Sequence, residues 1–224
     1  MQNFELYAIT SPVRGVGYPE MVGEAFAGGV DIVQFRAKDL SDREFFEIAQ
    51  QLVIVAREWK RPLIINDRID IALAVNADGV HLGQDDLPLS AARMLAARKK
   101  GFLIGKSTHN LEQALQAEKD GADYIGVGPV FATPTKPDYP PVGLELVKQV
   151  KDKVRIPFAA IGGIDETNLA QVIECGAEAI AVVRAVFGQK NIREAAKELK
   201  EKIKLSSCAG FLNSPLWKRG VRGV

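Results

Sequence analysis

The length, composition and charge of the chain limit the classes of protein to which it can belong. Its 224 residues suffice for one α/β barrel, and with 47% apolar residues it can form a sizeable core. Because 29 Lys and Arg residues nearly balance 28 Asp and Glu residues, no general field favours nucleic acid or an anionic membrane. Cys175 and Cys208 lack the spacing of a disulfide framework or a zinc site. Without a signal peptide or a membrane-spanning run, the sequence predicts a cytoplasmic protein.

Short apolar runs alternate with amphipathic segments along the chain, a pattern typical of repeated βα units. Strands are expected at 6–10, 32–36, 63–67, 79–83, 103–107, 124–128, 158–162 and 179–183. Helices are expected at 18–27, 41–58, 69–75, 88–98, 110–119, 143–151, 167–174 and 191–204. Eight such units predict a TIM (β/α)8 barrel, whereas an open doubly wound sheet would have fewer strands and a switch point.

The expected domain organisation is a single catalytic barrel over residues 1–205, followed by a tail over 206–224. Ser41 and Glu44 form a capping box at one helix start, and Asn110 and Gln113 have a similar form at another. After Leu205 no helical or strand period is visible, so a disordered C-terminal tail is expected. The alternative is a basic docking arm anchored by Trp217.

Two neighbouring apolar runs end in acidic residues. Asp67 follows the run at Leu63–Ile65, and Asp86 follows the run at Gly79–Leu82. Tips of parallel strands meet at one edge of a sheet, so the two carboxylates should lie close together. Hard oxygen ligands of this kind suit Mg²⁺ bound jointly with a substrate phosphate. The alternative is that both acids are helix N-caps.

The second strand carries cationic and polar residues at its tip. Alternation sends Gln34, Arg36 and Lys38 to one face, with Phe35 and Ala37 on the other. A guanidinium fork and an ammonium group together suit a diphosphate. The alternative is a surface ion pair with a nearby acid such as Asp39 or Glu44.

Several other strand ends carry groups that could contact a ligand. Asn66 could bond a ring nitrogen, orient a metal shell or cap a helix, and Ser107 supplies a hydroxyl. The roles of His81 and His109 stay open, because a lone histidine is more often structural than catalytic. No spacing supports a catalytic triad with a nucleophile.

A second anion site is expected around Gly163 and Arg184. The loop over 128–137 is rich in proline and carries hydroxyls and Lys136, so it could bind phosphate at little ordering cost, and its Lys136 is assigned to the first site with Arg36, Lys38, Asp67 and Asp86. Gly163 after the seventh strand and Arg184 after the eighth lie where TIM barrels commonly bind a phosphate monoester.

Seven motifs together resemble the thiamine phosphate synthase family, and the resemblance covers about residues 6–205. They are QFRAK at 34–38, INDR at 65–68, GVHLGQDD at 79–86, GKSTH at 105–109, GPVFATPTK at 128–136, AIGGI at 160–164 and AVVRA at 181–185. In that family a TIM barrel joins hydroxymethylpyrimidine diphosphate to thiazole phosphate, or to its carboxylated form, and releases diphosphate. The resemblance thus implies a transferase of thiamine biosynthesis that uses Mg²⁺.

The resemblance also implies roles for individual residues. The pyrimidine diphosphate would be held by Gln34, Phe35, Arg36, Ala37, Lys38, Asn66, Ser107 and Lys136. The thiazole phosphate would be surrounded by Thr133, Pro134, Thr135, Gly163, Val183 and Arg184. Mg²⁺ would be held by Asp67 and Asp86, and catalysis would rest on Arg36, Lys38, Ser107 and Lys136. Arg184 departs from the small hydroxyl residue that many members carry.

The implied mechanism is dissociative: diphosphate leaves the methylene carbon, and the thiazole nitrogen captures the pyrimidine cation. Two alternatives stay open, namely a thiazole tautomerase-like isomerase in which His109 would matter, and a non-catalytic thiazole phosphate binder. The expected partners are small-molecule substrates rather than nucleic acid or membrane. The oligomeric state is left open, with a homo-oligomer as one option.

Overall fold

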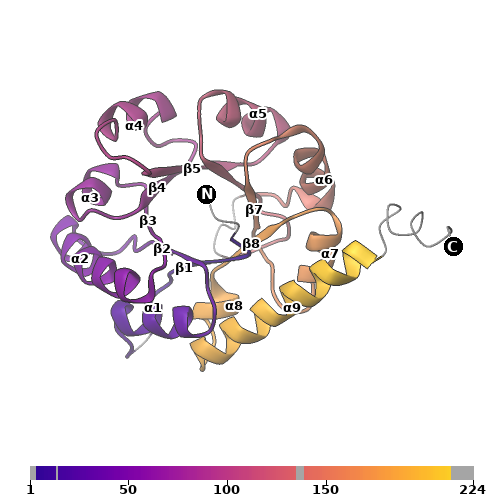
Figure 1. Cartoon of the computed structure of the whole chain (residues 1–224), viewed down its shortest axis with the longest axis horizontal. Coiled ribbons are helices and arrows are strands. Elements are labelled where there is room, and N and C mark those ends of the chain that lie inside the picture. The colour runs from indigo at the N-terminus through magenta and orange to yellow at the C-terminus, as the bar shows by residue number, and fades with distance from the viewer. Residues whose placement is uncertain (1–3, 14, 135–138, 213–224) are drawn as a thin grey trace, which may run out of the picture.

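The computed structural model describes residues 4–13, 15–134 and 139–212. Eight parallel strands close into a barrel in sequence order, and β1 completes the ring by pairing with β8. The strands are β1 Leu6–Ile9, β2 Ile32–Phe35, β3 Leu63–Asn66, β4 Gly79–Leu82, β5 Leu103–Thr108, β6 Tyr124–Val127, β7 Phe158–Ile161 and β8 Ala179–Val182. The predicted TIM barrel is therefore confirmed, and Figure 1 shows the helices ringing it.

The helices follow the strands in alternation. They are α1 Tyr18–Ala27, α2 Asp42–Trp59, α3 Ile69–Ala74, α4 Leu89–Leu95, α5 Leu111–Lys119, α6 Gly143–Lys153, α7 Leu169–Glu174, α8 Arg184–Phe187 and α9 Ile192–Leu212. The capping box predicted at Ser41 is present, and Asn110 accepts a hydrogen bond from the amide of Gln113. These local signals set where α2 and α5 begin.

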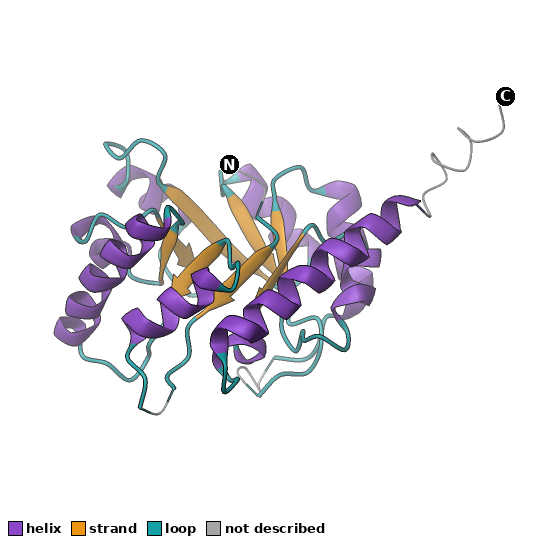
Figure 2. Cartoon of the chain, turned by 60° about the horizontal axis from the view of Figure 1, so that its bottom comes forward, coloured by secondary structure: helices purple, strands orange, loops and turns teal. Residues whose placement is uncertain are grey.

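Alternation along the strands separates two apolar cores. The outer core lies between barrel and helices, and the smaller inner core fills the barrel. Figure 2 shows the strands of the barrel with helices packed around them. On β1, Leu6 and Ala8 belong to the outer core, whereas Tyr7 and Ile9 belong to the inner one. Because side chains alternate along a strand, one face of the strand supplies the outer core and the other face supplies the barrel interior.

The C-terminal helix corrects one expectation from the sequence. α9 runs to Leu212, so the interpretation that the regular pattern stops at Leu205 is wrong for residues 206–212. α9 packs against α1 and α7, and a Cβ at Gly28 would lie 2.3 Å from the Arg193 carbonyl oxygen. The rest of the expected tail, including Trp217, lies outside the described residues. α8 was not predicted at all.

Candidate active site

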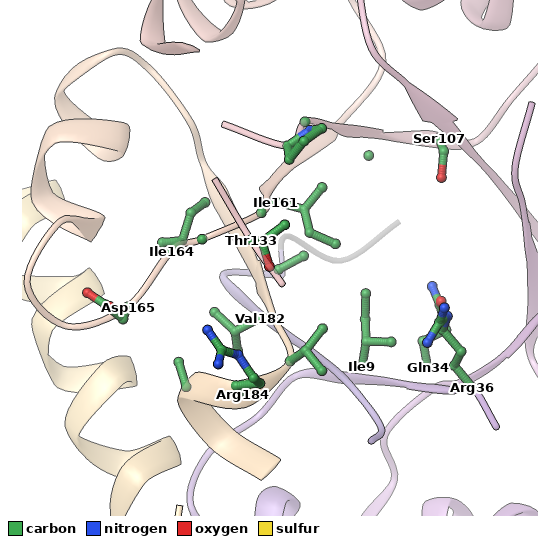
Figure 3. A pocket seen from close by; sticks show the side chains of 18 of the residues that line it. Ile9, Gln34, Arg36, Ser107, Thr133, Ile161, Ile164, Asp165, Val182 and Arg184 are labelled. Atoms are coloured by element: carbon green, nitrogen blue, oxygen red, sulfur yellow. The ribbon is translucent and has the colours of Figure 1, made fainter. Parts of the chain in front are cut away.

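Polar side chains converge at the C-terminal mouth of the barrel, where they surround a pocket of about 510 Å³. Every strand or the loop after it contributes to the lining, and the volume is in the range of small-molecule sites. Eight of the residues predicted from the sequence line it: Gln34, Arg36, Asn66, Ser107, Thr133, Gly163, Val183 and Arg184. Figure 3 shows Arg36 and Ser107 on one side of the pocket and Arg184 on the opposite side.

The remaining predicted residues lie elsewhere. Thr135 and Lys136 are outside the described residues, and Pro134 is exposed. Phe35 is fully buried in the outer core, with its ring 4.3 Å from that of Phe45. A side-chain contact between Phe35 and a ligand in the pocket is therefore excluded, which leaves only its backbone for the predicted role. The side chain of Ala37 also packs against the outer core.

Asp67 and Asp86 lie together, as their places after β3 and β4 predicted. The two carboxyl groups are close enough for Asp86 to perturb Asp67 directly, and the amide of Asp67 donates to the carbonyl of His81 at 2.8 Å. Burial, followed by the neighbouring Asp86, raises the pKa of Asp67 to about 6, against the opposing positive charges of Lys38 and Arg36. The pair thus gathers negative charge at a point that two cations face.

The alternative that these acids cap helices is wrong. α3 begins after Arg68 and α4 after Pro88, and neither helix has a side-chain cap hydrogen bond. Asp67 instead adopts a left-handed backbone with φ of 61°, which Asp and Asn tolerate better than most residues. Its carboxyl group interacts with Asp86 and does not cap the start of α3.

A lysine that the sequence analysis passed over supports this acid pair. The Lys106 Nζ donates to the Gly83 carbonyl at 2.6 Å, and the Gly83 amide donates to Asp86 Oδ2 at 2.6 Å. Burial lowers the pKa of Lys106, while Asp86 and Asp85 oppose that shift. The available signal was a charged residue inside a predicted strand, shortly after the apolar residues Leu103 and Ile104.

Arg36 and Lys38 are not engaged in the surface ion pairs that were the alternative. Among the described residues no acid pairs with either side chain, and the carboxylate of Glu44 accepts from Ser41 instead. The backbone of Arg36 is held on both sides by the Thr10 hydroxyl at 2.9 Å. The strand end therefore presents two cations to the acid pair.

The two histidines, whose roles the sequence left open, have different surroundings. His81 is buried in the barrel, where its Nε2 lies 3.0 Å from Ser107 Oγ. His109 lies at the pocket wall, with Nδ1 2.5 Å from the Gly128 carbonyl oxygen and its ring against Tyr139. His109 thereby ties the end of β5 to the loop after β6.

The opposite side of the pocket is built around the glycine pair after β7. Gly162 and Gly163 have φ of 101° and 64°, and a Cβ on either would lie within 3 Å of the loop over 129–132. Their lack of side chains is therefore required by this loop as well as by the backbone. Arg184 lines the same side and forms no ion pair within the described part of the chain.

Asp165 and Glu166 also line the pocket, and neither was among the site residues predicted from the sequence. The hydroxyl and amide of Thr167 hydrogen-bond the Asp165 carboxylate and lower its pKa. The usable signal for both acids was their position in the loop after β7, close behind its two glycines.

No helix in the described ranges is long and apolar enough to cross a membrane.

Fold and site together define a (β/α)8-barrel enzyme that acts on small molecules. The sequence model of one family, thiamine monophosphate synthase, matches residues 6–186. The chain belongs to this family.

Individual relatives agree with this family over most of the chain. The thiamine-phosphate synthase of Syntrophomonas wolfei is 48% identical over 202 residues, which cover 89% of this chain and 96% of the relative. That of Shouchella clausii is 49% identical over 204 residues, covering 89% and 96%. The solved structure of thiamine phosphate pyrophosphorylase from Pyrococcus furiosus has a TM-score of 0.84 at 40% identity, covering 91% of this chain and 97% of that one. These matches confirm the resemblance, and they do not favour the isomerase or the non-catalytic binder.

Proposed function

We propose that this enzyme joins hydroxymethylpyrimidine diphosphate to thiazole phosphate, or to its carboxylated form, and releases diphosphate, together with CO₂ when the carboxylated form reacts. The observation that carries the proposal is the acid pair Asp67 and Asp86, which the positive charges of Arg36 and Lys38 influence. Arg36 lines one side of the pocket, and a further cation, Arg184, lines the opposite side. This arrangement has room for two anionic groups at separate places. The names of the relatives point to the same reaction.

The first anionic group would be the diphosphate of the pyrimidine substrate. Arg36 and Lys38 would neutralise it, together with Lys136, which lies outside the described residues, and the Ser107 hydroxyl would help to orient the substrate. The C–O bond between the methylene carbon and the diphosphate breaks, and its electron pair leaves with the diphosphate. The lone pair of the thiazole nitrogen then forms the new C–N bond. Catalysis thus rests on charge neutralisation and alignment.

The acid pair fits a divalent cation. Burial and the neighbouring Asp86 raise the pKa of Asp67, so the ionised pair has an excess of negative charge that a cation would relieve. The described residues contain no cluster of three or more His, Cys, Asp or Glu side chains, so the remaining ligands would be water and diphosphate oxygens. This is how Mg²⁺ usually binds in phosphate-handling sites. Bound Mg²⁺ would stabilise the charge of the departing diphosphate.

The second anionic group would be the phosphate of the thiazole. Gly163, Val183 and Arg184 lie after β7 and β8, where TIM barrels commonly bind phosphate, and Thr133 lines the same pocket. Pro134 and Thr135 belong to the same proposal through the loop after β6. Cytoplasmic location and small-molecule partners are part of the proposal, and the oligomeric state stays open.

The test is incubation of the purified full chain with both substrates and Mg²⁺, followed by chromatography of the products. Thiamine phosphate is the expected product, and its formation should stop when either substrate is omitted. An isomerised thiazole phosphate without condensation would support the isomerase. Tight binding of thiazole phosphate without any product would support the non-catalytic binder.

A further inference from the structure

Five polar side chains form a continuous hydrogen-bonded chain across the barrel interior. Gln34 Nε2 donates to the Tyr7 hydroxyl at 2.8 Å, and that hydroxyl lies 2.9 Å from the hydroxyl of Tyr124. The Tyr124 hydroxyl lies 3.2 Å from His81 Nδ1, and His81 Nε2 lies 3.0 Å from Ser107 Oγ. Both ends of this chain, Gln34 and Ser107, line the pocket, whereas the two tyrosines lie beneath it.

The barrel makes room for this chain at a specific position. A Cβ at Gly105 would lie 2.2 Å from Tyr124 Cζ and 2.5 Å from His81 Nδ1, so any larger residue would displace both. Below them, Phe4 meets the rings of Tyr7 and Tyr124 edge-on, with centroids 5.9 and 6.0 Å apart. The two phenols are therefore packed in fixed positions, out of contact with solvent.

Hydrogen-bond accounting gives the chain a direction. The amide nitrogen of Gln34 can only donate, so the Tyr7 oxygen accepts; on the condition that every hydroxyl proton of the chain is used, the Tyr7 proton goes to Tyr124. The same condition sends the Tyr124 proton to His81 Nδ1, and a neutral His81 ring then carries its proton on Nε2, from which it is donated to Ser107. Burial raises the pKa of both phenols above its usual value, so each keeps its proton at neutral pH.

We propose that Tyr7, Tyr124 and His81 are positioning residues, whose one-way hydrogen-bond chain turns the Gln34 amide oxygen and the Ser107 hydroxyl proton toward the pocket. At its two ends the chain thus presents one acceptor and one donor. A ligand there must donate a hydrogen bond to Gln34 and accept one from Ser107. An aminopyrimidine carries both an amino donor and ring-nitrogen acceptors, so this inference deepens the proposed function and rests on it for the identity of the ligand.

The direct test is the tautomer of His81, measured by two-bond ¹H–¹⁵N correlation spectra of the free protein labelled at histidine. Only two histidines are present, and a His109→Gln variant identifies the signal of His81. The wild type should show His81 neutral with its proton on Nε2. Tyr124→Phe should convert a large part of the population to the Nδ1–H form. Tyr7→Phe should leave the tautomer unchanged, because the Tyr124 hydroxyl still donates to His81.

The kinetic test uses the same tyrosine-to-phenylalanine change at two places. Tyr124→Phe should raise the KM for the pyrimidine diphosphate by about tenfold, as expected for the loss of one oriented hydrogen bond, and leave the KM for thiazole phosphate within about twofold. Tyr18→Phe, in which the ring packs outside the barrel against Phe35, is the matched control and should change neither constant.

Two results would overturn the proposal: an Nδ1–H tautomer in the wild type, which means that the chain runs in the opposite direction, or an unchanged tautomer in Tyr124→Phe. Because the spectra are recorded without substrate, they decide the direction of the chain even if the protein fails to make thiamine phosphate. A failure of the proposed function is thereby distinguished from a failure of this inference.

Discussion

Replacement of Asp67 by asparagine tests the acid pair by two opposite effects: a gain of stability without Mg²⁺, and a loss of the response to Mg²⁺. The amide keeps the shape of the side chain, tolerates the left-handed φ of 61° and removes the titrating group. The pKa of Asp67 is raised from its ordinary 3.8 to about 6, which corresponds to at most ~3 kcal/mol. Because the side chain is only half-buried, solvent screening reduces this to about 1 kcal/mol.

The sign follows from the raised pKa. Folding favours the protonated form of Asp67, so this contribution is present below about pH 4 and is lost as the pH rises through about 6. Without Mg²⁺, the unfolding free energy of Asp67→Asn minus that of the wild type should therefore increase by about 1 kcal/mol from pH 4 to pH 7. Urea denaturation in EDTA at both pH values measures this difference.

The metal has the opposite consequence. Mg²⁺ should raise the unfolding midpoint of the wild type and leave that of Asp67→Asn nearly unchanged, and most of the activity of the variant should be lost. Asp85→Asn, an exposed acid in the same loop as Asp86, is the matched control and should keep the Mg²⁺ response. The role of Asp67 in the acid pair would be refuted if the stability difference between Asp67→Asn and the wild type were the same at both pH values. It would also be refuted if the variant retained Mg²⁺-dependent turnover.

Three further changes have expected outcomes. Arg184→Ala should raise the KM for thiazole phosphate about tenfold, as for a lost hydrogen bond to a charged group, and move the KM for the pyrimidine diphosphate much less; equal effects on both would place Arg184 outside the monophosphate site. Lys106→Met should weaken Mg²⁺ binding in calorimetry by loosening the turn that holds Asp86, and unaltered affinity would contradict this role. Truncation after Leu205 should leave the melting temperature and activity nearly unchanged, because Ile203 is the last buried side chain described in α9; a loss of several degrees would show that 206–224 packs on the barrel.

The barrel was predictable because its strands are buried on both faces, which produces short apolar runs that local signals delimit. α8 escaped prediction because four residues, Arg184–Phe187, are too few to show a helical period. The extension of α9 escaped it because 206–212 contain serines and a glycine, which have low helix propensity. At both α8 and the end of α9, a helix forms although the local sequence gives no helical signal.

The candidate site was predictable where strand ends alone decide it. Asp67 and Asp86 follow adjacent parallel strands, so their meeting follows from topology. The contacts of Lys106 with Gly83, and of Tyr124 with His81, depend on the register between strands in a closed barrel, which pairs Lys106 with Leu82. That register follows from the stagger of the whole barrel and is invisible in a local pattern.

The most direct measurement of the central claim is the stoichiometry of the reaction, followed by ³¹P NMR with both substrates and Mg²⁺ present. The account predicts that one diphosphate is released for each thiamine phosphate formed, with no diphosphate released when thiazole phosphate is omitted. Release of diphosphate without thiamine phosphate, or unchanged spectra of both substrates with active protein, would contradict the claim that this barrel joins the two substrates.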